Sequence, residues 1–247
     1  MERQRSLSVS ICMATYNGAA FIEEQLNSIL PQLNNEDELV VSDDASTDGT
    51  WELLKNRQMQ DQRIKLYRNQ GKGVISNFEN AMRHCQNAVI FFSDQDDVWK
   101  ENKIDVMIHY FEKNPEATVV VSDLIIVDND FKILISSYQE MRKTKTGFWQ
   151  NLLRSSYIGA GMAFRSDLKK LILPIPDDVP MHDMWIGLLA DENKGVMFIP
   201  EKLVYYRRHG LNATEINTTA SFMQQVKWRW NAWRLVRRRL KEVQKKS

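Results

Sequence analysis

Residues 91–99 read FFSDQDDVW, an apolar run followed at once by acidic and amide side chains. The apolar part has the composition of a buried β-strand. Asp94, Asp96 and Asp97 then fall within four positions. Such like charges repel one another unless a cation, hydrogen bonds or bulk water offsets the repulsion. The cluster is therefore a candidate site for Mg²⁺ or Mn²⁺, and a polar loop that caps a helix is the alternative.

The pattern around this stretch predicts an open α/β sheet. Apolar runs rich in β-branched residues alternate with segments of helical periodicity, and strands joined by helices of this length pair in parallel. The expected strands are 7–14, 37–46, 63–69, 87–94 and 117–128, and the expected helices lie within 19–30, 46–58, 74–85 and 100–114. The second half is less regular, with helices at 147–154 and 181–192, a Gly-Ala-Gly turn at 159–161 and one or two strands within 195–210.

Polar side chains follow the first, second and fourth of these strands. They are Thr15-Tyr16-Asn17, Asp43-Asp44 and the Asp94–Asp97 cluster. Ligands of open α/β sheets bind beyond the carboxyl ends of the strands, so we expect the three groups to meet on one rim. The carboxylates of Asp43 and Asp44 suit a nucleobase imide or a ribose hydroxyl, and capping of the next helix is the alternative.

Two common phosphate-binding motifs are absent from the sequence. No GxGxxG follows the first strand and no GxxxxGK[ST] occurs, which disfavours a dinucleotide dehydrogenase and a P-loop phosphotransferase. A phosphate would then have to be held by a metal ion. Arg207 and Arg208 can contact a diphosphate and His209 can complete the metal site, or the three can form a solvated strand end. Asp183, which follows His182, is either a helix cap or a carboxylate general base.

The bulk composition is typical of a soluble globular protein. The 247 residues are 43% hydrophobic and 26% charged. Two cysteines, Cys12 and Cys85, make neither a disulfide framework nor a zinc pattern, and fit a reducing compartment. The N-terminus predicts a first strand rather than a signal peptide, and no apolar stretch reaches the ~18 residues of a membrane span.

Together the motifs resemble the family 2 glycosyltransferases, nucleotide-sugar-dependent enzymes of the GT-A fold, over roughly residues 7–210. The combination of SDQDDVW, HDxW and YRRHG is most similar to bacterial rhamnosyltransferase-like members, which build cell-surface polysaccharide. The resemblance implies a mostly parallel nucleotide-binding sheet flanked by helices. Seven segments occur in the family's order: SVSICMATYNG, VVSDDASTDGT, GVISNFENAM, FFSDQDDVW, IGAGMAFRSDL, MHDMWIGLLA and YYRRHG.

The resemblance also implies roles for individual residues. Asp44 matches the carboxylate that contacts a uracil or thymine ring, and Asp94 and Asp96 match the DxD pair that holds Mg²⁺ or Mn²⁺ against the diphosphate, with Asp97 beside them. Asp183 matches the catalytic base, and His182 stands where many members have an acidic residue. The other positions matched to nucleotide-sugar contacts are Thr15, Tyr16, Asn17, Asp43, Asn77 and Gly161 of the turn Gly159-Ala160-Gly161.

The implied reaction is an inverting single displacement. A sugar passes from a dTDP- or UDP-sugar, with dTDP-rhamnose among the candidates, to a hydroxyl of a glycan or of a polyprenyl-linked acceptor. Two alternatives remain at this point: a metal-dependent nucleotide-sugar phosphohydrolase, and a non-catalytic relative that binds nucleotide-sugars.

The end of the chain is strongly basic. Residues 222–247 hold nine lysines and arginines and one glutamate, a charge of +8, so the other 221 residues carry −7 of the net +1. On a helix, one broad face would be apolar, with Trp228 and Leu235 pointing away from it. That face would consist of Phe222, Met223, Val226, Trp230, Trp233, Val236, Leu240 and Val243, interrupted by Arg229 and Arg237.

This pattern predicts a helix that lies on an anionic membrane surface. The resemblance implies an acceptor on a lipid carrier at the cytoplasmic membrane face, and hence a cytoplasmic enzyme bound peripherally to the inner face of the plasma membrane. Packing against the body and a dimer contact are the alternatives, and nucleic acid is a weaker one because no recognition module accompanies the charge. We therefore divide the chain into a catalytic domain at 1–215 and a tail at 216–247. The catalytic domain has a nucleotide-binding half at about 1–100 and an acceptor half at about 101–215.

Overall fold

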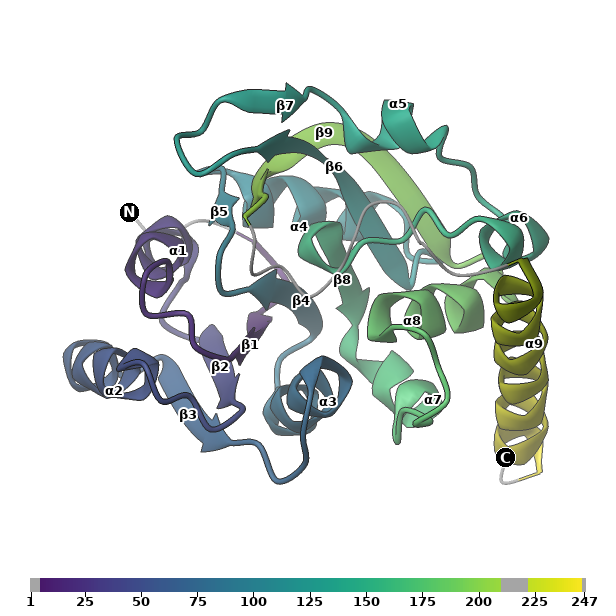
Figure 1. Cartoon of the computed structure of the whole chain (residues 1–247), viewed down its shortest axis with the longest axis horizontal. Coiled ribbons are helices and arrows are strands. Elements are labelled where there is room, and N and C mark those ends of the chain that lie inside the picture. Colours follow the sequence, from purple (N-terminus) through teal and green to yellow (C-terminus); the bar gives the residue numbers. More distant parts are fainter. Residues whose placement is uncertain (1–4, 210–221, 246–247) are drawn as a thin grey trace.

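A computed structural model describes residues 5–209 and 222–245, and shows a mixed sheet with helices on both faces (Figure 1). The strand order is β3-β2-β1-β4-β8-β6-β9-β5, with β7 paired to β6. The first four strands are mutually parallel, as the sequence predicts. They are β1 (Val9–Thr15), β2 (Glu38–Asp43), β3 (Ile64–Arg68) and β4 (Val89–Asp94), joined by α1 (Ile22–Ile29), α2 (Thr50–Gln60) and α3 (Val74–His84).

The other half of the sheet is not purely parallel. The short strand β8 (Met162–Arg165) runs antiparallel between β4 and β6 (Val119–Val127). Strand β9 (Val196–Arg207) pairs parallel with β6, and β5 (Val98–Trp99) pairs antiparallel with β9. Besides three short 3-10 helices, the other elements are β7 (Ile133–Ile135) and the α-helices α4 (Lys103–Lys113), α5 (Tyr138–Arg142), α6 (Phe148–Leu153), α7 (Lys169–Ile172), α8 (His182–Asp191) and α9 (Phe222–Gln244).

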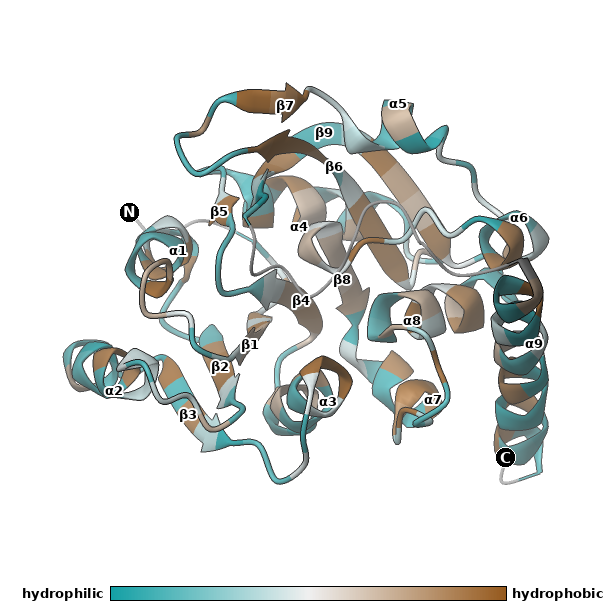
Figure 2. Ribbon diagram, viewed as in Figure 1, coloured by the Kyte–Doolittle hydropathy of each residue, from teal (hydrophilic) through white to brown (hydrophobic). Residues whose placement is uncertain are grey.

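Both faces of the central strands are buried, which explains why these strands are almost continuously apolar (Figure 2). Successive side chains point to opposite faces. Phe91 belongs to the hydrophobic cluster that includes residues of α1 and α4, whereas its neighbour Phe92 belongs to the cluster that includes residues of α3 and α8. Cys12 and Cys85 are both buried free thiols.

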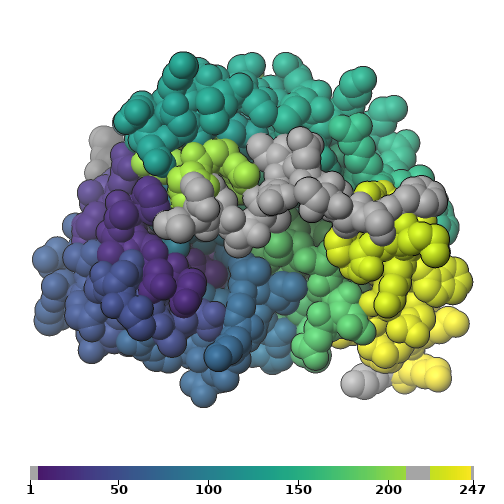
Figure 3. Space-filling view, in the orientation of Figure 1, coloured from purple at the N-terminus to yellow at the C-terminus, as the bar shows by residue number. Residues whose placement is uncertain are grey.

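The C-terminal helix α9 packs along the body rather than standing apart. Ala232, Leu235 and Val236 are 2%, 4% and 0% exposed, and they join the hydrophobic cluster of α8. The prediction that Leu235 points away from the apolar face is therefore wrong. Figure 3 shows the helix against the segment that carries α7 and α8. Residues 216–221 of the predicted tail and the side chain of Phe222 lie outside the described part.

Within the described ranges, no helix combines the length and the apolarity that crossing a bilayer requires.

Candidate active site

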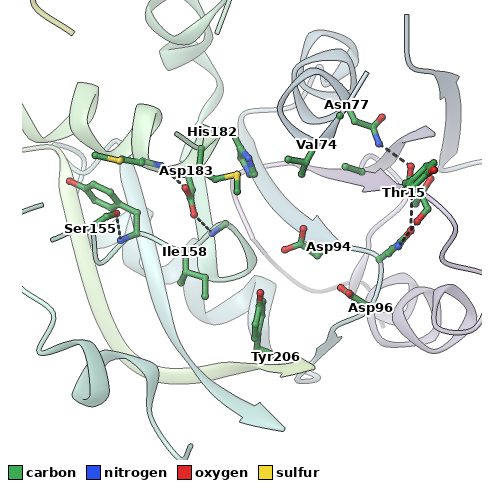
Figure 4. Close-up of a pocket in the computed structure, with 18 of the residues that line it drawn as sticks. Thr15, Val74, Asn77, Asp94, Asp96, Ser155, Ile158, His182, Asp183 and Tyr206 are labelled. Carbon is green, nitrogen blue, oxygen red and sulfur yellow. Dashed lines mark hydrogen bonds between the residues drawn. The ribbon is translucent and has the colours of Figure 1, made fainter. Parts of the chain in front are cut away.

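A cavity of about 550 Å³ opens at the carboxyl ends of β1 and β4, a size usual for small-molecule sites. It confirms that the strand-end residues meet on one rim. Figure 4 shows Asp94 and Asp96 on one side and Asp183 on the other. The predicted site residues that line this cavity are Thr15, Tyr16, Asp44, Asn77, Asp94, Asp96, Asp183 and Arg208.

The side of the cavity nearest β1 and β2 has the groups that a nucleoside needs. Asp44 is fixed by N–H donors, since its carboxylate accepts from Asn69 Nδ2 and from the Gly73 amide, both at 2.8 Å. Gly73 has φ +86°, which favours glycine. Asn77 donates from Nδ2 to the Thr15 carbonyl at 2.9 Å, while its buried Oδ1 has no partner among the described residues. An acceptor left in this way suits a hydroxyl or imide donor of a ligand.

Three residues that the resemblance assigned to the nucleotide-sugar do not line the cavity. Asp43 is fully buried and accepts from Thr15 Oγ1 at 3.0 Å and Ser46 Oγ at 2.6 Å. Asn17 holds the neighbouring loop by accepting from the Thr47 amide at 2.9 Å. Gly161 is a packing glycine, because a Cβ there would lie 2.7 Å from the Ser122 carbonyl oxygen. The residue of that turn that lines the cavity is Gly159.

The acidic cluster divides into two parts. Asp94 and Asp96 line the cavity, whereas Asp97 is 1% exposed, lies outside it and accepts from the Arg207 amide at 3.2 Å. Burial and then the charge of Asp96 raise the pKa of Asp94 to about 7. Burial raises the pKa of Asp97 as well. The predicted role of Asp97 as a metal ligand is therefore not supported by its position.

At the end of β9, only one of two neighbouring arginines lines the cavity. Arg208 lines the cavity, but Arg207 is 5% exposed, donates from Nε to the Asp96 carbonyl at 3.0 Å and forms an ion pair with Glu24. Arg207 thus supports the loop of the acidic cluster instead of facing the cavity, contrary to the prediction. His209 Nε2 lies 2.8 Å from Asp96 Oδ2, so these two side chains are close enough to share a ligand or a proton.

A divalent cation fits this arrangement only in part. The described residues include no group of three or more His, Cys, Asp and Glu side chains placed to hold a metal ion. Mg²⁺ and Mn²⁺ are, however, commonly held by one or two carboxylates together with substrate phosphates. Asp94 and Asp96 supply two carboxylates whose mutual repulsion a cation would relieve. The donor set therefore fits a metal that arrives with a diphosphate.

A buried lysine beneath this cluster was not found from the sequence. Lys103, in the first turn of α4, is fully buried, and its Nζ lies 3.7 Å from the centre of the Trp99 ring. It donates to the Ala160 carbonyl at 2.7 Å, and burial lowers its pKa to about 7. A lysine at the start of a helix is ordinarily exposed, so nothing in the sequence indicated that Lys103 would be buried near Asp94 and Asp97.

Asp183 lies on the opposite wall, near the start of α8. Its Oδ2 accepts from the Gly159 amide at 3.0 Å and its Oδ1 from the Met184 amide at 2.6 Å. Met181 is the N-cap residue of the helix, so the helix-cap alternative for Asp183 is wrong. Burial raises the pKa of Asp183 to about 6. A carboxylate held in this way can accept a proton near neutral pH.

The wall around Asp183 carries aromatic side chains and a cation that the sequence did not indicate. Tyr138 and Arg142 of α5, Tyr157 and Tyr206 all line the cavity. Arg142 donates to the Ser155 carbonyl, which ties α5 to the segment that follows α6. Tyr206 belongs to β9 and to the segment YYRRHG, but no role was assigned to it from the sequence, and none of the seven segments contains Tyr138, Arg142 or Tyr157.

The comparisons with known proteins agree on one family. A sequence-family model described as Glycosyl transferase family 2 matches residues 10–172, which include the acidic cluster but end before Asp183. An uncharacterized glycosyltransferase of Haemophilus influenzae is 30% identical, over 84% of this chain and 68% of its own length. The dTDP-rhamnosyl transferase RfbG of Shigella flexneri is 28% identical, over 87% of this chain and 77% of its own.

A further relative and two solved structures extend this likeness. The Escherichia coli enzyme WfaP, named a UDP-Glc:alpha-D-GlcNAc-diphosphoundecaprenol beta-1,3-glucosyltransferase, is 29% identical over 81% of this chain and 77% of its own. S. aureus TarS 1-349 in complex with UDP-GlcNAc superposes with a TM-score of 0.70, at 17% identity over 91% of this chain and 66% of that one. The mannosyltransferase PcManGT of Pyrobaculum calidifontis, in complex with GDP-Man and Mn²⁺, has a TM-score of 0.60 at 22% identity, over 79% and 55% of the two chains. At these identities the structural likeness establishes the fold alone.

Proposed function

The chain belongs to glycosyl transferase family 2, the nucleotide-sugar-dependent glycosyltransferases, and from that premise we propose an inverting transfer with Asp183 as base. The donor is a dTDP- or UDP-sugar, and the acceptor is a hydroxyl of a glycan or lipid-linked sugar in cell-surface polysaccharide synthesis. The observation that carries the proposal is the cavity with Asp94 and Asp96 on one wall and Asp183 on the other.

This arrangement suits a single displacement. Asp44 and Asn77 Oδ1, which has no partner among the described residues, bind the nucleoside, and Arg208 binds the diphosphate. The acceptor hydroxyl lies beside Asp183, which takes its proton while the oxygen attacks the anomeric carbon from the face opposite the leaving group. The amides of Gly159 and Met184 fix the orientation of the carboxylate. Asp94 and Asp96, with His209 beside them, would hold Mg²⁺ or Mn²⁺, whose positive charge would offset the negative charge of the departing diphosphate.

The donor and acceptor classes are supported by the named relatives. One acts as a dTDP-rhamnosyl transferase and another uses UDP-Glc and a diphosphoundecaprenol-linked sugar. We extend both classes to this chain as alternatives, with dTDP-rhamnose among the candidate donors. The division into a catalytic region at 1–215, with halves at about 1–100 and 101–215, and a segment at 216–247 also remains part of the proposal.

A lipid-linked acceptor would place the enzyme at the inner face of the plasma membrane, and we propose peripheral binding there. Helices α6 and α9 are joined by a hydrogen bond from Arg229 Nε to the Leu153 carbonyl. Both helices expose large apolar side chains at this junction, with Trp149 at 60%, Leu153 at 62% and Trp230 at 63%. Exposed tryptophans beside a basic helix are typical of proteins that lie on anionic lipid.

The proposed reaction is tested first by calorimetry with UDP and dTDP, with and without Mn²⁺. We expect binding that excess chelator abolishes and that Asp96→Asn weakens at least about tenfold. Asp167→Asn, which changes an exposed carboxylate outside the cavity, is the matched control. Equal affinity in chelator would contradict the metal role. Cleavage of a nucleotide-sugar that no acceptor accelerates would point to the phosphohydrolase alternative instead.

A further inference from the structure

His182, the first residue of α8, is a buried polar side chain that lies among aromatic rings. It is 4% exposed, and neither ring nitrogen has a hydrogen-bond partner among the described residues. The imidazole stacks on Phe78, with ring centres 4.2 Å apart, and meets the edge of Phe92 at 5.0 Å. These apolar surroundings lower the pKa of His182 to about 3, so the ring is neutral at physiological pH.

Packing alone does not explain a histidine at this position. A buried polar group without a partner is destabilising, and a phenylalanine would fill the same aromatic slot without that cost. The ring also forms part of the cavity wall. A Cβ on Gly159 would lie 3.1 Å from His182 Nε2, so the glycine leaves room beside this nitrogen.

We propose that His182 forms a hydrogen bond with a hydroxyl of the transferred sugar and thereby helps to select the donor. This inference rests on the proposed transferase function. The sugar must lie between the diphosphate at Asp94 and the acceptor hydroxyl at Asp183. In the view of Figure 4 the His182 ring lies between Asp183 and Val74 of α3, and it lines the same cavity as Asp94 and Asp183. Its aromatic neighbours Phe78 and Phe92 belong to α3 and β4, the elements that carry Asn77 and Asp94.

The chemistry of a neutral imidazole limits the kind of sugar. It offers one N–H donor and one acceptor nitrogen, and it adds no charge to a site that already holds Asp94, Asp96 and Asp183. An ionised carboxylate at this position could only accept. His182 therefore fits a neutral sugar whose hydroxyl both donates and accepts, and it offers no charge to a uronate.

The decisive variant is His182→Phe, which keeps the stacked ring and removes both nitrogens. The substrate is the UDP- or dTDP-hexose that the wild type transfers fastest. We expect kcat/KM to fall about 10- to 100-fold, as for the loss of a buried hydrogen bond to substrate. Affinity for sugar-free UDP or dTDP with Mn²⁺ should change less than about twofold. Thermal stability should stay equal or rise, because two unpartnered polar atoms are gone.

Two further variants sharpen the test. His182→Gln, which keeps a donor and an acceptor, should recover part of the lost activity. His84→Phe changes another stacked imidazole, outside the cavity, and should change neither quantity. Transfer by His182→Phe within about threefold of wild type would overturn the proposal. So would a lower melting temperature or failure to fold, because the ring nitrogens would then serve the structure. If the proposed function itself is wrong, the wild type will transfer no sugar, which is a different outcome.

Discussion

Replacing Asp183 by asparagine changes two independent quantities, the transfer rate and the pH dependence of stability. An asparagine oxygen can keep one of the two amide contacts, to Gly159 at 3.0 Å or to Met184 at 2.6 Å. The amide group cannot take a proton near neutral pH. We therefore expect the rate constant of transfer to fall about 10²–10⁴-fold. Affinity for UDP with Mn²⁺ should remain within about twofold, because Asp183 lies on the wall opposite Asp94.

The effect on stability follows from the pKa of Asp183, which burial raises from 3.8 to about 6. Between these values the folded state holds more protons at this carboxyl than the unfolded state does. The stabilisation is thus fully present below pH 3.8 and is lost as the pH rises through about 6. The contribution of Asp183 to the free energy of unfolding is about 3 kcal/mol in all, and about 1.4 kcal/mol of it is lost between about pH 5 and pH 8. Asparagine does not titrate, so the variant lacks this slope.

The assay is guanidinium unfolding of the metal-free wild type and variant at both pH values. The free energy of unfolding of the wild type minus that of the variant should be about 1.4 kcal/mol more positive at about pH 5 than at about pH 8. The kcat/KM of the wild type should fall as the pH drops through about 6, because protonated Asp183 cannot act as the base. Transfer by the variant within about tenfold of wild type would refute the base assignment. A pH slope of stability that the substitution leaves unchanged would refute the argument from burial.

Two further predictions concern other parts of the chain. Lys103→Met removes a fully buried amino group beneath Asp94 and should lower the free energy of unfolding by about 3 kcal/mol, measured by denaturation at about pH 6, where an amino group with a pKa of about 7 is mostly protonated, whereas Lys113→Met at the far end of α4 should have little effect. A loss below about 1 kcal/mol would show that Lys103 does not offset the acidic cluster. The full chain should sediment with phosphatidylglycerol vesicles at low salt and less so as salt is added, and Trp149→Glu with Trp230→Glu should abolish sedimentation. The control Met59→Glu changes a side chain on α2 that is 78% exposed and should keep binding, while a wild type that ignores the vesicles would contradict the membrane proposal.

The first half of the fold could be predicted because its strands are long, buried on both faces and separated by helices. Strands β1, β2 and β4 meet those conditions, β3 is a shorter and only partly buried edge strand, and all four pair in parallel. Strand β8 does not, since it has four residues and follows a Gly-Ala-Gly turn. Its antiparallel entry between β4 and β6 depends on long-range pairing. Hydrophobic periodicity carries no information about such pairing.

The sequence predicted pairs of neighbouring site residues, and in the structure only one member of each pair lines the cavity. Asp44 faces the cavity and Asp43 does not, Asp96 does and Asp97 does not, and Arg208 does and Arg207 does not. Burial separates the members of each pair, since Asp43, Asp97 and Arg207 are 0%, 1% and 5% exposed. Alternation along an extended chain does not explain the choice, because Asp96 lies in a turn and the intervening Gln95 also lines the cavity. The sequence therefore carries no local signal for the choice within each pair, nor for Arg142 and Lys103.

The helical pattern of α9 predicted the wrong orientation for Leu235, and the reason lies in how the helix packs. A helical wheel sorts residues around the axis and assumes the same neighbour along the whole length. In the fold, the buried side chains of α9 are Ala232, Leu235 and Val236, from the middle of the helix onward, and the exposed large apolar side chains Met223, Val226, Trp228 and Trp230 all precede them.

Some of the basic residues of α9 have partners within the protein. Arg239 donates to the carbonyls of Leu171, Ile172 and Pro174 near the end of α7, and Arg237 pairs with Glu192. Arg237 and Arg239 thus interact within the protein, so the charge of +8 exceeds the positive charge that is available to bind a membrane. The surface left for lipid is the junction of α6 with the first half of α9. This junction is followed directly by Ser155, Tyr157 and Ile158, which line the cavity on the side of Asp183. Binding through this junction would bring the acceptor side of the cavity, rather than the nucleotide side, next to the bilayer.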